Sequence, residues 1–277
     1  MKAILVPVEQ HTSPAVFHAA LAVARPFDSY VEGIASGPRV PDVIITDVGT
    51  LPILEPDTRR ELATNARQQF EAWMVSQSVP PRPDEPHGLC FGWHGDELVD
   101  DDALGCRGRA FDLTVVSKAG SRRDEPRMAT VESALFDSGR PVLIVPPSAP
   151  ELPALGDTIV VSWNGSTETA RAVSFAMPFL VRARQVTVLT VKGALVDGPS
   201  GEQIAAMLRL HGVPAAALPR EDERRSPGAT ILAQAQELGA DLLVKGAYTQ
   251  SRIRELIFGG ATRHILEHTD LPVLMAH

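Results

Sequence analysis

An internal repeat is the feature of this sequence that most restricts its fold, because one structural unit must then be built twice. Four kinds of segment recur in the same order: a first apolar run, an alanine-rich helical pattern, a late aspartate before an apolar run, and a closing proline before a last apolar run. In residue numbers the pairs are 4–8 with 159–163, 13–24 with 167–180, 112–116 with 241–244, and 140–145 with 271–275. A chain of 277 residues has room for two domains of this kind.

The boundary between the two copies is marked by proline. Residues 146–153 contain four prolines in eight positions. Because proline fixes φ and lacks an N–H, such a segment cannot continue a helix or a central strand. We therefore predict a stiff linker, with one domain over residues 1–148 and a second over residues 155–277.

Each copy has the pattern of an α/β fold. Its predicted strands are short, nearly continuous apolar runs, which are typical of strands covered on both faces of a parallel sheet. Strand–helix alternation favours right-handed crossovers, so the sequence predicts two tandem doubly wound parallel sheets with about five strands each. Besides the two repeated helices, helical patterns cover 59–74, 128–136, 201–210 and 229–238.

The first copy carries an insertion, at about residues 37–56, that is rich in Pro, Val, Ile and Asp. A segment of this length is too long for an ordinary connection between elements. Two interpretations are open: a lid over the functional site, or an arm that packs against the other copy. The many apolar residues of the insertion favour the packing arm.

Charge and hydropathy exclude two classes of protein. The chain has 26 basic and 34 acidic residues, a formal net charge of −8, whereas nucleic-acid binding needs an excess of Lys and Arg on one face. No apolar stretch approaches the roughly 18 residues that a membrane helix requires, and the opening apolar run is too short for a signal peptide. We expect a cytoplasmic protein that binds neither nucleic acid nor membranes.

Glycines near the C-terminus mark a candidate binding site. Ligands of an open parallel sheet bind at the carboxyl ends of its strands. In the second copy the loop after the fourth strand begins at Gly246, and Gly259 and Gly260 stand where the last helix is expected to begin. Glycine lets the backbone approach an anion, the helix N-terminus offers free N–H donors, and Thr262 could add a hydroxyl. The same glycines also fit an ordinary turn and helix cap.

This stretch resembles the universal stress protein family, whose nucleotide-binding members carry G-x2-G-x9-G-[S/T] at the same place. Gly246 matches the first glycine of that motif and Gly259 the third, with the nine-residue spacing over 250–258 intact. Two positions depart from the motif, because Thr249 replaces the second glycine and Gly260 replaces the Ser or Thr. The resemblance extends over both copies and implies the adenine nucleotide α-hydrolase-like fold of that family.

The resemblance also implies a ligand for the second copy: ATP or another adenine nucleotide, with or without Mg²⁺. Asn164, at the end of the first strand, stands where the family has an acidic residue for the ribose hydroxyls. Val191, at the end of the second strand, stands at the adenine. Read from the residues alone, Asn164-Gly165-Ser166 is also a turn and helix N-cap, and Val191 is also an ordinary core residue. The phosphates would lie among Gly246, Thr249, Gly259, Gly260 and Thr262.

The first copy is a poorer match to the family's site. Glu9 ends its first strand as a stand-in for the acidic residue, but Met128 and Ala129 occupy the places of Gly259 and Gly260. A methionine side chain there would fill the space of a phosphate. We therefore expect no nucleotide in the first copy, which serves as structure or as an interface, through self-association or through pairing of the two copies within one chain.

Three functions are compatible with these features. A tandem universal stress protein would be a non-catalytic stress-response module that responds to a nucleotide in its second half. The same fold without a ligand would be an interaction or scaffold protein acting through dimer surfaces. An adenylate-forming or ATP-hydrolysing enzyme is the third possibility, but no nucleophile or catalytic base can be named at the strand ends. We predict neither a catalytic residue nor a metal site.

Overall fold

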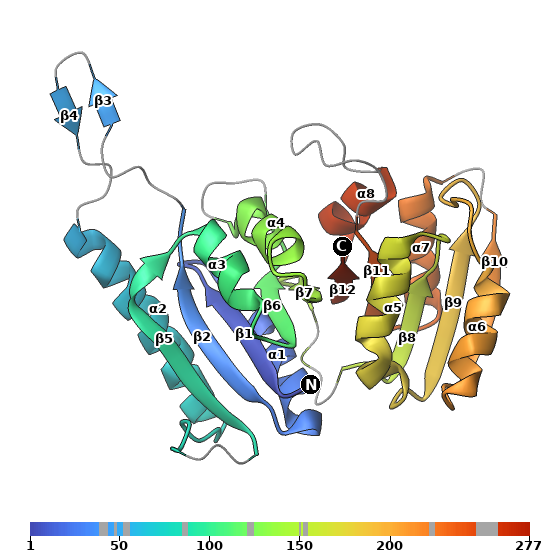
Figure 1. Cartoon of the computed structure of the whole chain (residues 1–277), viewed down its shortest axis with the longest axis horizontal. Helices are drawn as coiled ribbons and strands as arrows, with labels where there is room; N and C mark the ends of the chain where they lie inside the picture. Colours follow the sequence, from blue (N-terminus) through green and yellow to red (C-terminus); the bar gives the residue numbers. More distant parts are fainter. Residues whose placement is uncertain are drawn as a thin grey trace.

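One sheet of ten strands runs through both halves of the chain (Figure 1). The computed structural model describes residues 1–38, 44–46, 49–51, 56–84, 88–120, 125–149, 151, 155–221, 225–247 and 260–277. The strands of the sheet are β1 (Ala3–Val8), β2 (Tyr30–Ser36), β5 (Cys90–Val99), β6 (Leu113–Ser117), β7 (Val142–Val145), β8 (Thr158–Ser162), β9 (Gln185–Val191), β10 (Ala215–Arg220), β11 (Leu242–Gly246) and β12 (Val273–Ala276). Their order is β10-β9-β8-β11-β12-β7-β6-β1-β2-β5, so each half contributes five strands in the same relative order.

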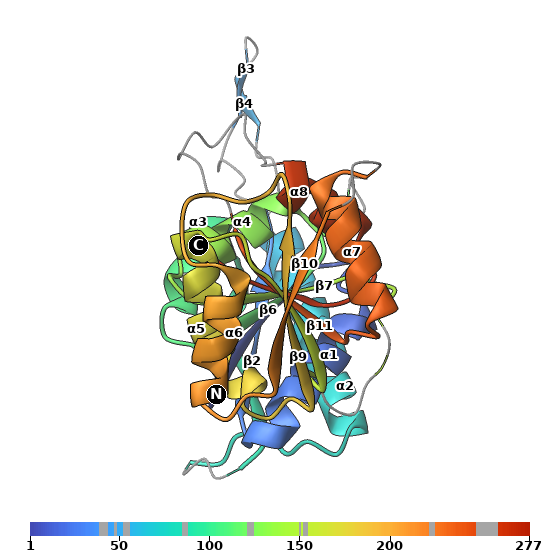
Figure 2. The ribbon, with the colours of Figure 1, turned by 90° about the vertical axis from the view of Figure 1, so that its right-hand side faces the viewer.

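Helices cover both faces of this sheet (Figure 2). They are α1 (Pro14–Phe27), α2 (Pro56–Ser76), α3 (Asp101–Gly108), α4 (Met128–Phe136), α5 (Thr167–Leu180), α6 (Gly201–Leu210), α7 (Pro227–Glu237) and α8 (Gly260–His268). The largest apolar cluster joins α1, α2, α5 and α6 to one face, and a second joins α4, α7 and α8 to the other. The doubly wound α/β fold predicted for each half is confirmed, and the helices predicted over 128–136, 167–180 and 201–210 have those bounds.

The two halves meet through their last strands. Every neighbouring pair within a half is parallel, whereas β7 and β12 pair antiparallel, with Leu143 opposite Leu274. Side-chain contacts support this junction: the ammonium of Lys118, in the loop after β6, donates to the backbone carbonyls of Glu267 (2.9 Å) and Thr269 (3.2 Å) at the end of α8. The sequence pattern predicts two sheets, and the structure joins them into one.

The repeated aspartates fasten the first strand of each half. A carboxylate oxygen of Asp112 accepts backbone N–H groups of Lys2 and Ala3 at the start of β1. The carboxylate of Asp241 accepts the N–H groups of residues 156–158 at the start of β8, at 2.9 to 3.2 Å. Both aspartates directly precede the strand that lies beside the fastened one. The repeat therefore preserves a structural contact that aligns two neighbouring strands.

The described part of the insertion is a small hairpin. Its strands β3 (Ile44–Thr46) and β4 (Gly49–Leu51) pair antiparallel in a sheet of their own. Figures 1 and 2 both place this hairpin apart from the ten-stranded sheet and from the second half, against which a packing arm would have to lie. Within the part of the chain that the structure describes, no helix is both long and apolar enough to cross a membrane.

Candidate functional site

The candidate site of the second half is built from the ends of β8 and β11 and the first turn of α8. In the parallel pair formed by these two strands, Lys245 lies opposite Ser162. The next residue of β11 is Gly246, and α8 begins at Gly260, two residues before Thr262. Thr249 and Gly259 lie outside the described residues. The structure therefore brings together Gly246, Gly260 and Thr262 around one additional side chain, Lys245.

Lys245 is a buried lysine that the sequence reasoning missed. Its side-chain ammonium donates to the hydroxyl of Thr262 and to the carbonyl of Gly246, both at 2.8 Å. Burial lowers the pKa of this lysine from 10.5 to about 8, because removing a cation from water disfavours its charged form. The signal was available in the sequence as a single cation within the apolar run Leu242-Leu243-Val244-Lys245.

Gly246 has a structural reason to be glycine. A Cβ atom at this position would lie 2.4 Å from the backbone nitrogen of Thr169 and 2.6 Å from its hydroxyl oxygen, in the first turn of α5. The close approach that glycine permits here is therefore to a helix of the same half. Gly260 is different, because a Cβ atom there would meet none of the described residues within 4 Å.

The side chain of Asn164 is hydrogen-bonded to other residues of the same half. Its side-chain oxygen accepts hydrogen bonds from the backbone N–H of Ser166 (3.2 Å) and the hydroxyl of Thr169 (2.6 Å). Ser166 in turn is the N-cap of α5 and accepts the N–H of Thr169 at 3.2 Å. The interpretation of Asn164-Gly165-Ser166 as a turn and N-cap is thus confirmed, and it occupies the oxygen that could otherwise face a ribose.

The loop after β9 lies on the loop after β8. The N–H of Val196 donates to the carbonyl of Asn164 (2.9 Å), and the indole N–H of Trp163 donates to the carbonyl of Pro199 (2.7 Å). Gly165 has a φ of +91°, and a Cβ atom there would lie 2.6 Å from the carbonyl oxygen of Val196. Val191, just before this loop, is 3% exposed and belongs to an apolar cluster, as a core residue does.

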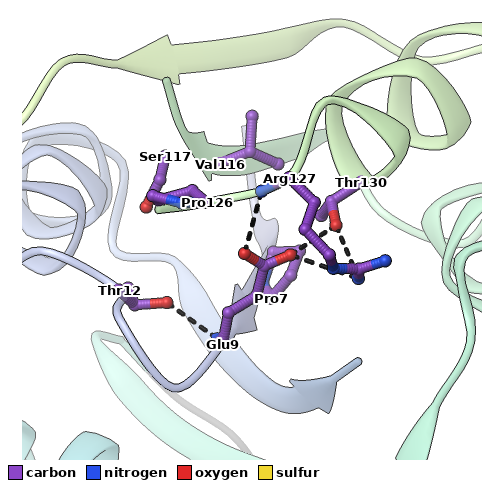
Figure 3. Close-up of a pocket in the computed structure, with 8 residues that line it drawn as sticks. All are labelled: Pro7, Glu9, Thr12, Val116, Ser117, Pro126, Arg127 and Thr130. Atoms are coloured by element: carbon purple, nitrogen blue, oxygen red, sulfur yellow. Dashed lines mark hydrogen bonds and ion pairs between the residues drawn. The ribbon is translucent and has the colours of Figure 1, made fainter. Parts of the chain in front are cut away.

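The first half closes the corresponding place with its own charged side chains (Figure 3). The carboxylate of Glu9 accepts the backbone N–H of Arg127 (3.2 Å) and the hydroxyl of Thr130, both at the N-terminus of α4. The guanidinium of Arg127 forms an ion pair with Glu9 (3.2 Å) and two hydrogen bonds to Asp101 (2.7 and 2.9 Å). The residues around this network enclose a cavity of about 10 Å³, which is at the lower limit for one water molecule.

The equivalent helices α4 and α8 therefore differ in the charged groups that lie at their N-termini. Glu9 supplies a carboxylate to α4, and the corresponding residue of the second half, Asn164, is neutral and instead holds the turn before α5. Val116, a member of the apolar cluster that includes α4, lines the cavity beside Glu9 and Arg127, whereas Lys245 occupies that strand position in the second half. Among the described residues, no carboxylate is hydrogen-bonded to Lys245 or to the backbone at the start of α8, where the side chain of Arg263 pairs with Glu267 on the surface.

Replacing Arg127 with methionine should lower the free energy of unfolding by about 2 kcal/mol, because Glu9 and Asp101 would keep partly buried charges without their shared cation. The effect is smaller than for a fully buried pair, since the Arg127 side chain remains 25% exposed. Urea denaturation at pH 7 measures it. Arg263→Met, which removes an exposed ion pair to Glu267, should cost less than about 1 kcal/mol, and equal losses in both variants would contradict a supporting role for the network.

Comparison with known proteins agrees with this architecture. Residues 156–277 match the sequence model of the universal stress protein family. A universal stress protein from Archaeoglobus fulgidus has a similar fold, with a TM-score of 0.69 at 16% identity, covering 99% of this chain and 95% of that one. A protein of unknown function from Pseudomonas aeruginosa has a TM-score of 0.58 at 15% identity, covering 100% and 92%. No curated protein matches the sequence. Residues 156–277 are thus a universal stress protein domain, and the first half of the chain repeats its fold in tandem.

Proposed function

We propose that the second half binds an adenine nucleotide, with its phosphates at the N-terminus of α8, and that the protein is a nucleotide-responsive stress module rather than an enzyme. The observation that supports this proposal is the contrast between the two halves. A carboxylate accepts a backbone N–H at the N-terminus of α4, whereas none among the described residues does so at the start of α8, whose first turn lies over a buried lysine.

An anion at α8 would balance this positive charge. The N-terminus of a helix carries about half a positive charge together with unpaired N–H donors. A buried ammonium next to it adds to the positive potential, and a buried charge is costly unless it is paired. A phosphate group would supply both the missing negative charge and the acceptors. In the first half, Glu9 already meets these requirements, which explains why only one half would need a ligand.

The proposed site assigns a role to each predicted residue. Gly259 and Gly260 would leave room for a phosphate at the start of α8, and Thr249 would lie in the loop before it. Thr262 would act through Lys245, since its hydroxyl accepts the hydrogen bond of that lysine. Mg²⁺ would accompany the triphosphate as it does in solution. Asn164 and Val191 are assigned to ribose and adenine only by their positions at the ends of β8 and β9.

Millimolar ATP with Mg²⁺ should raise the melting temperature of the purified protein. A ligand that binds only the folded state stabilises it by about 2.7 kcal/mol at a hundredfold excess over Kd. Gly260→Val should abolish this shift, because the variant adds bulk to the first turn of α8 at a position where no described residue lies within 4 Å of an added Cβ atom. Ala129→Val, at the corresponding exposed position of α4, should leave the shift intact. Absence of any shift with the wild-type protein would refute nucleotide binding.

A ligand-free interaction protein is the second candidate. It is favoured by the internal roles of two predicted site residues, because Asn164 holds the turn before α5 and Gly246 allows the close approach of α5. In that case ATP, ADP and adenosine would leave the melting temperature unchanged at all concentrations below those at which nucleotides bind proteins non-specifically. The titration that tests the first candidate therefore also tests this one.

A further inference from the structure

Two histidines lie one turn apart on α8. The imidazole rings of His264 and His268 are stacked, with their centroids 4.2 Å apart and their planes 17° from parallel. The rings meet because residues four apart in sequence share one face of a helix. Imidazole nitrogens are the commonest protein ligands of transition-metal ions. The stacking therefore places two metal-ligating groups side by side.

A backbone hydrogen bond orients the second of these rings. Nδ1 of His268 lies 2.9 Å from the carbonyl oxygen of His264. Because a carbonyl oxygen can only accept, Nδ1 carries the proton, and the neutral ring keeps its lone pair on Nε2. A hydrogen bond from one ring nitrogen to a backbone carbonyl is also how proteins commonly orient a metal-ligating imidazole. Nε2 of His268 is thus left as the nitrogen that a metal ion would use.

The first ring is positioned by the neighbouring helix. Helix α7 approaches α8 at Gly228, where an added Cβ atom would lie 2.8 Å from the Cβ atom of His264. His264 is half-buried and His268 is exposed. Within the part of the chain that the structure describes, no hydrogen bond or ion pair engages a ring nitrogen of His264 or Nε2 of His268. Since rotation about χ2 of histidine is soft, His264 can turn a nitrogen towards Nε2 of His268.

The sequence spacing and the local charge are both compatible with a cation. Residues 264–268 read H-x-x-E-H, the spacing with which the helix of one class of zinc peptidases holds its metal. Arg263, the cation that precedes His264, is paired with Glu267 at 2.7 Å, so these two side chains add no net charge beside the rings. Among the described residues there is no group of three or more His, Cys, Asp or Glu side chains that could hold a metal. A site here would therefore have two histidine ligands.

We propose that His264 and His268 together bind a divalent transition-metal ion, Zn²⁺ or one of its neighbours Ni²⁺ and Cu²⁺, with water at the remaining positions. A tetrahedral zinc ion with Zn–N distances of about 2.0–2.1 Å needs the two nitrogens about 3.4 Å apart. Mg²⁺ and Ca²⁺ prefer oxygen ligands and would not bind. The site is independent of the proposed nucleotide site, because it uses the middle and the end of α8. We predicted no metal site from the sequence, and the ring stacking and the carbonyl bond are what the structure adds.

Calorimetric titration of the full-length, tag-free protein with ZnCl₂ at pH 7.5 tests the proposal. We expect one Zn²⁺ per chain and no binding of Mg²⁺. His264→Gln and His268→Gln should each lower the affinity at least tenfold, because loss of an outer-shell partner alone typically costs about 10–100-fold and loss of a ligand should cost no less. The matched control is His211→Gln, which removes an exposed histidine at the C-cap of α6 and should bind Zn²⁺ as wild type does.

Two further measurements identify the ligands and the state of the variants. The electron paramagnetic resonance spectrum of one equivalent of Cu²⁺ should show two coupled nitrogens in the wild type and fewer in either α8 variant. Melting temperatures without metal should be the same in all four proteins, and Zn²⁺ should raise them only in the wild type and His211→Gln, since a ligand of the folded state stabilises it.

Three results would overturn the proposal. The wild-type protein may bind no Zn²⁺. Equal binding by all four proteins would place the metal elsewhere on the chain. Loss of binding in His268→Gln alone would mean that one imidazole acts without the other, so that the stacked pair is not a chelate and His268 has only its role at the end of the helix.

Discussion

Replacing Lys245 with methionine should raise the free energy of unfolding of the ligand-free protein at pH 7 by about 2 kcal/mol. Burial lowers the pKa of this lysine from 10.5 to about 8, and a shift of that size corresponds to about 3 kcal/mol of destabilisation while the group is charged. Methionine fills a similar volume without the charge. It also leaves Thr262 and the carbonyl of Gly246 without the lysine donor, which offsets about 1 kcal/mol of the gain.

The size of this stabilisation depends on pH. The pKa of Lys245 is lower in the folded than in the unfolded chain, so between about pH 8 and pH 10.5 the unfolded chain binds more protons. Stability of the wild-type protein therefore gains from rising pH across this window. The advantage of Lys245→Met should be complete below pH 8, shrink through the window and disappear above it. Urea denaturation of the two proteins at several pH values between 6.5 and about 10 measures the difference.

Two results would count against this reasoning. A constant loss of stability in Lys245→Met at every pH would mean that the hydrogen bonds to Thr262 and Gly246 outweigh the charge. Parallel pH profiles would mean that Lys245 titrates normally in the folded protein. Lys2→Met controls for removal of a lysine from the surface and should change stability by no more than about 0.5 kcal/mol.

Replacing Gly246 with alanine should lower the free energy of unfolding by about 3 kcal/mol, whereas the same change at Gly260 should be neutral or slightly stabilising. The added Cβ at Gly246 would lie 2.4 Å from the backbone nitrogen of Thr169, so the first turn of α5 would have to move, and overpacking of this kind typically costs about 1–3 kcal/mol. At Gly260 an added Cβ atom would meet none of the residues that the structure describes within 4 Å. Alanine there lowers the conformational entropy of the unfolded chain, which stabilises the fold by about 0.4–1 kcal/mol.

The two alanine variants distinguish a glycine required for packing from a glycine required for phosphate binding, which the motif alone does not do. If both glycines existed only for a phosphate, both alanine variants would be stable and both would lose nucleotide affinity. We expect instead that Gly246→Ala loses stability even without ligand, as measured by urea denaturation at pH 7. A Gly246→Ala protein as stable as wild type would show that α5 does not approach β11 as closely as described.

Local sequence patterns were sufficient for the fold. Repetition, apolar runs and helical periodicity identified the two doubly wound halves, and the spacing of Ser166 before α5 identified its cap. The patterns did not predict one sheet, because the pairing of β7 with β12 depends on the facing edges of two domains rather than on any residue within one. The placement of the β3–β4 hairpin was not predictable either, because apolar composition does not say which surface a segment covers.

The candidate site was harder to predict, since its residues interact across long stretches of chain. Gly246 fits a phosphate motif, yet its closest contact is with Thr169 on another element. Glu9 was identified as an acidic stand-in, but its partners Arg127 and Thr130 come from a distant helix. Lys245 was passed over because it is masked by an apolar run. Motif spacing locates such a site, whereas the partner of each side chain follows only from the packed structure.

Because β7 and β12 belong to one chain, their pairing does not depend on protein concentration. An identical pairing between two separate chains would form or dissociate with protein concentration, and its stability would fall on dilution. Within one chain the two strands are held at a high effective concentration by the proline-containing linker. Each half is therefore always paired with the other. One half can carry Arg127 and Glu9 in place of a ligand while the other carries Lys245, and the combination does not depend on the association of two different chains.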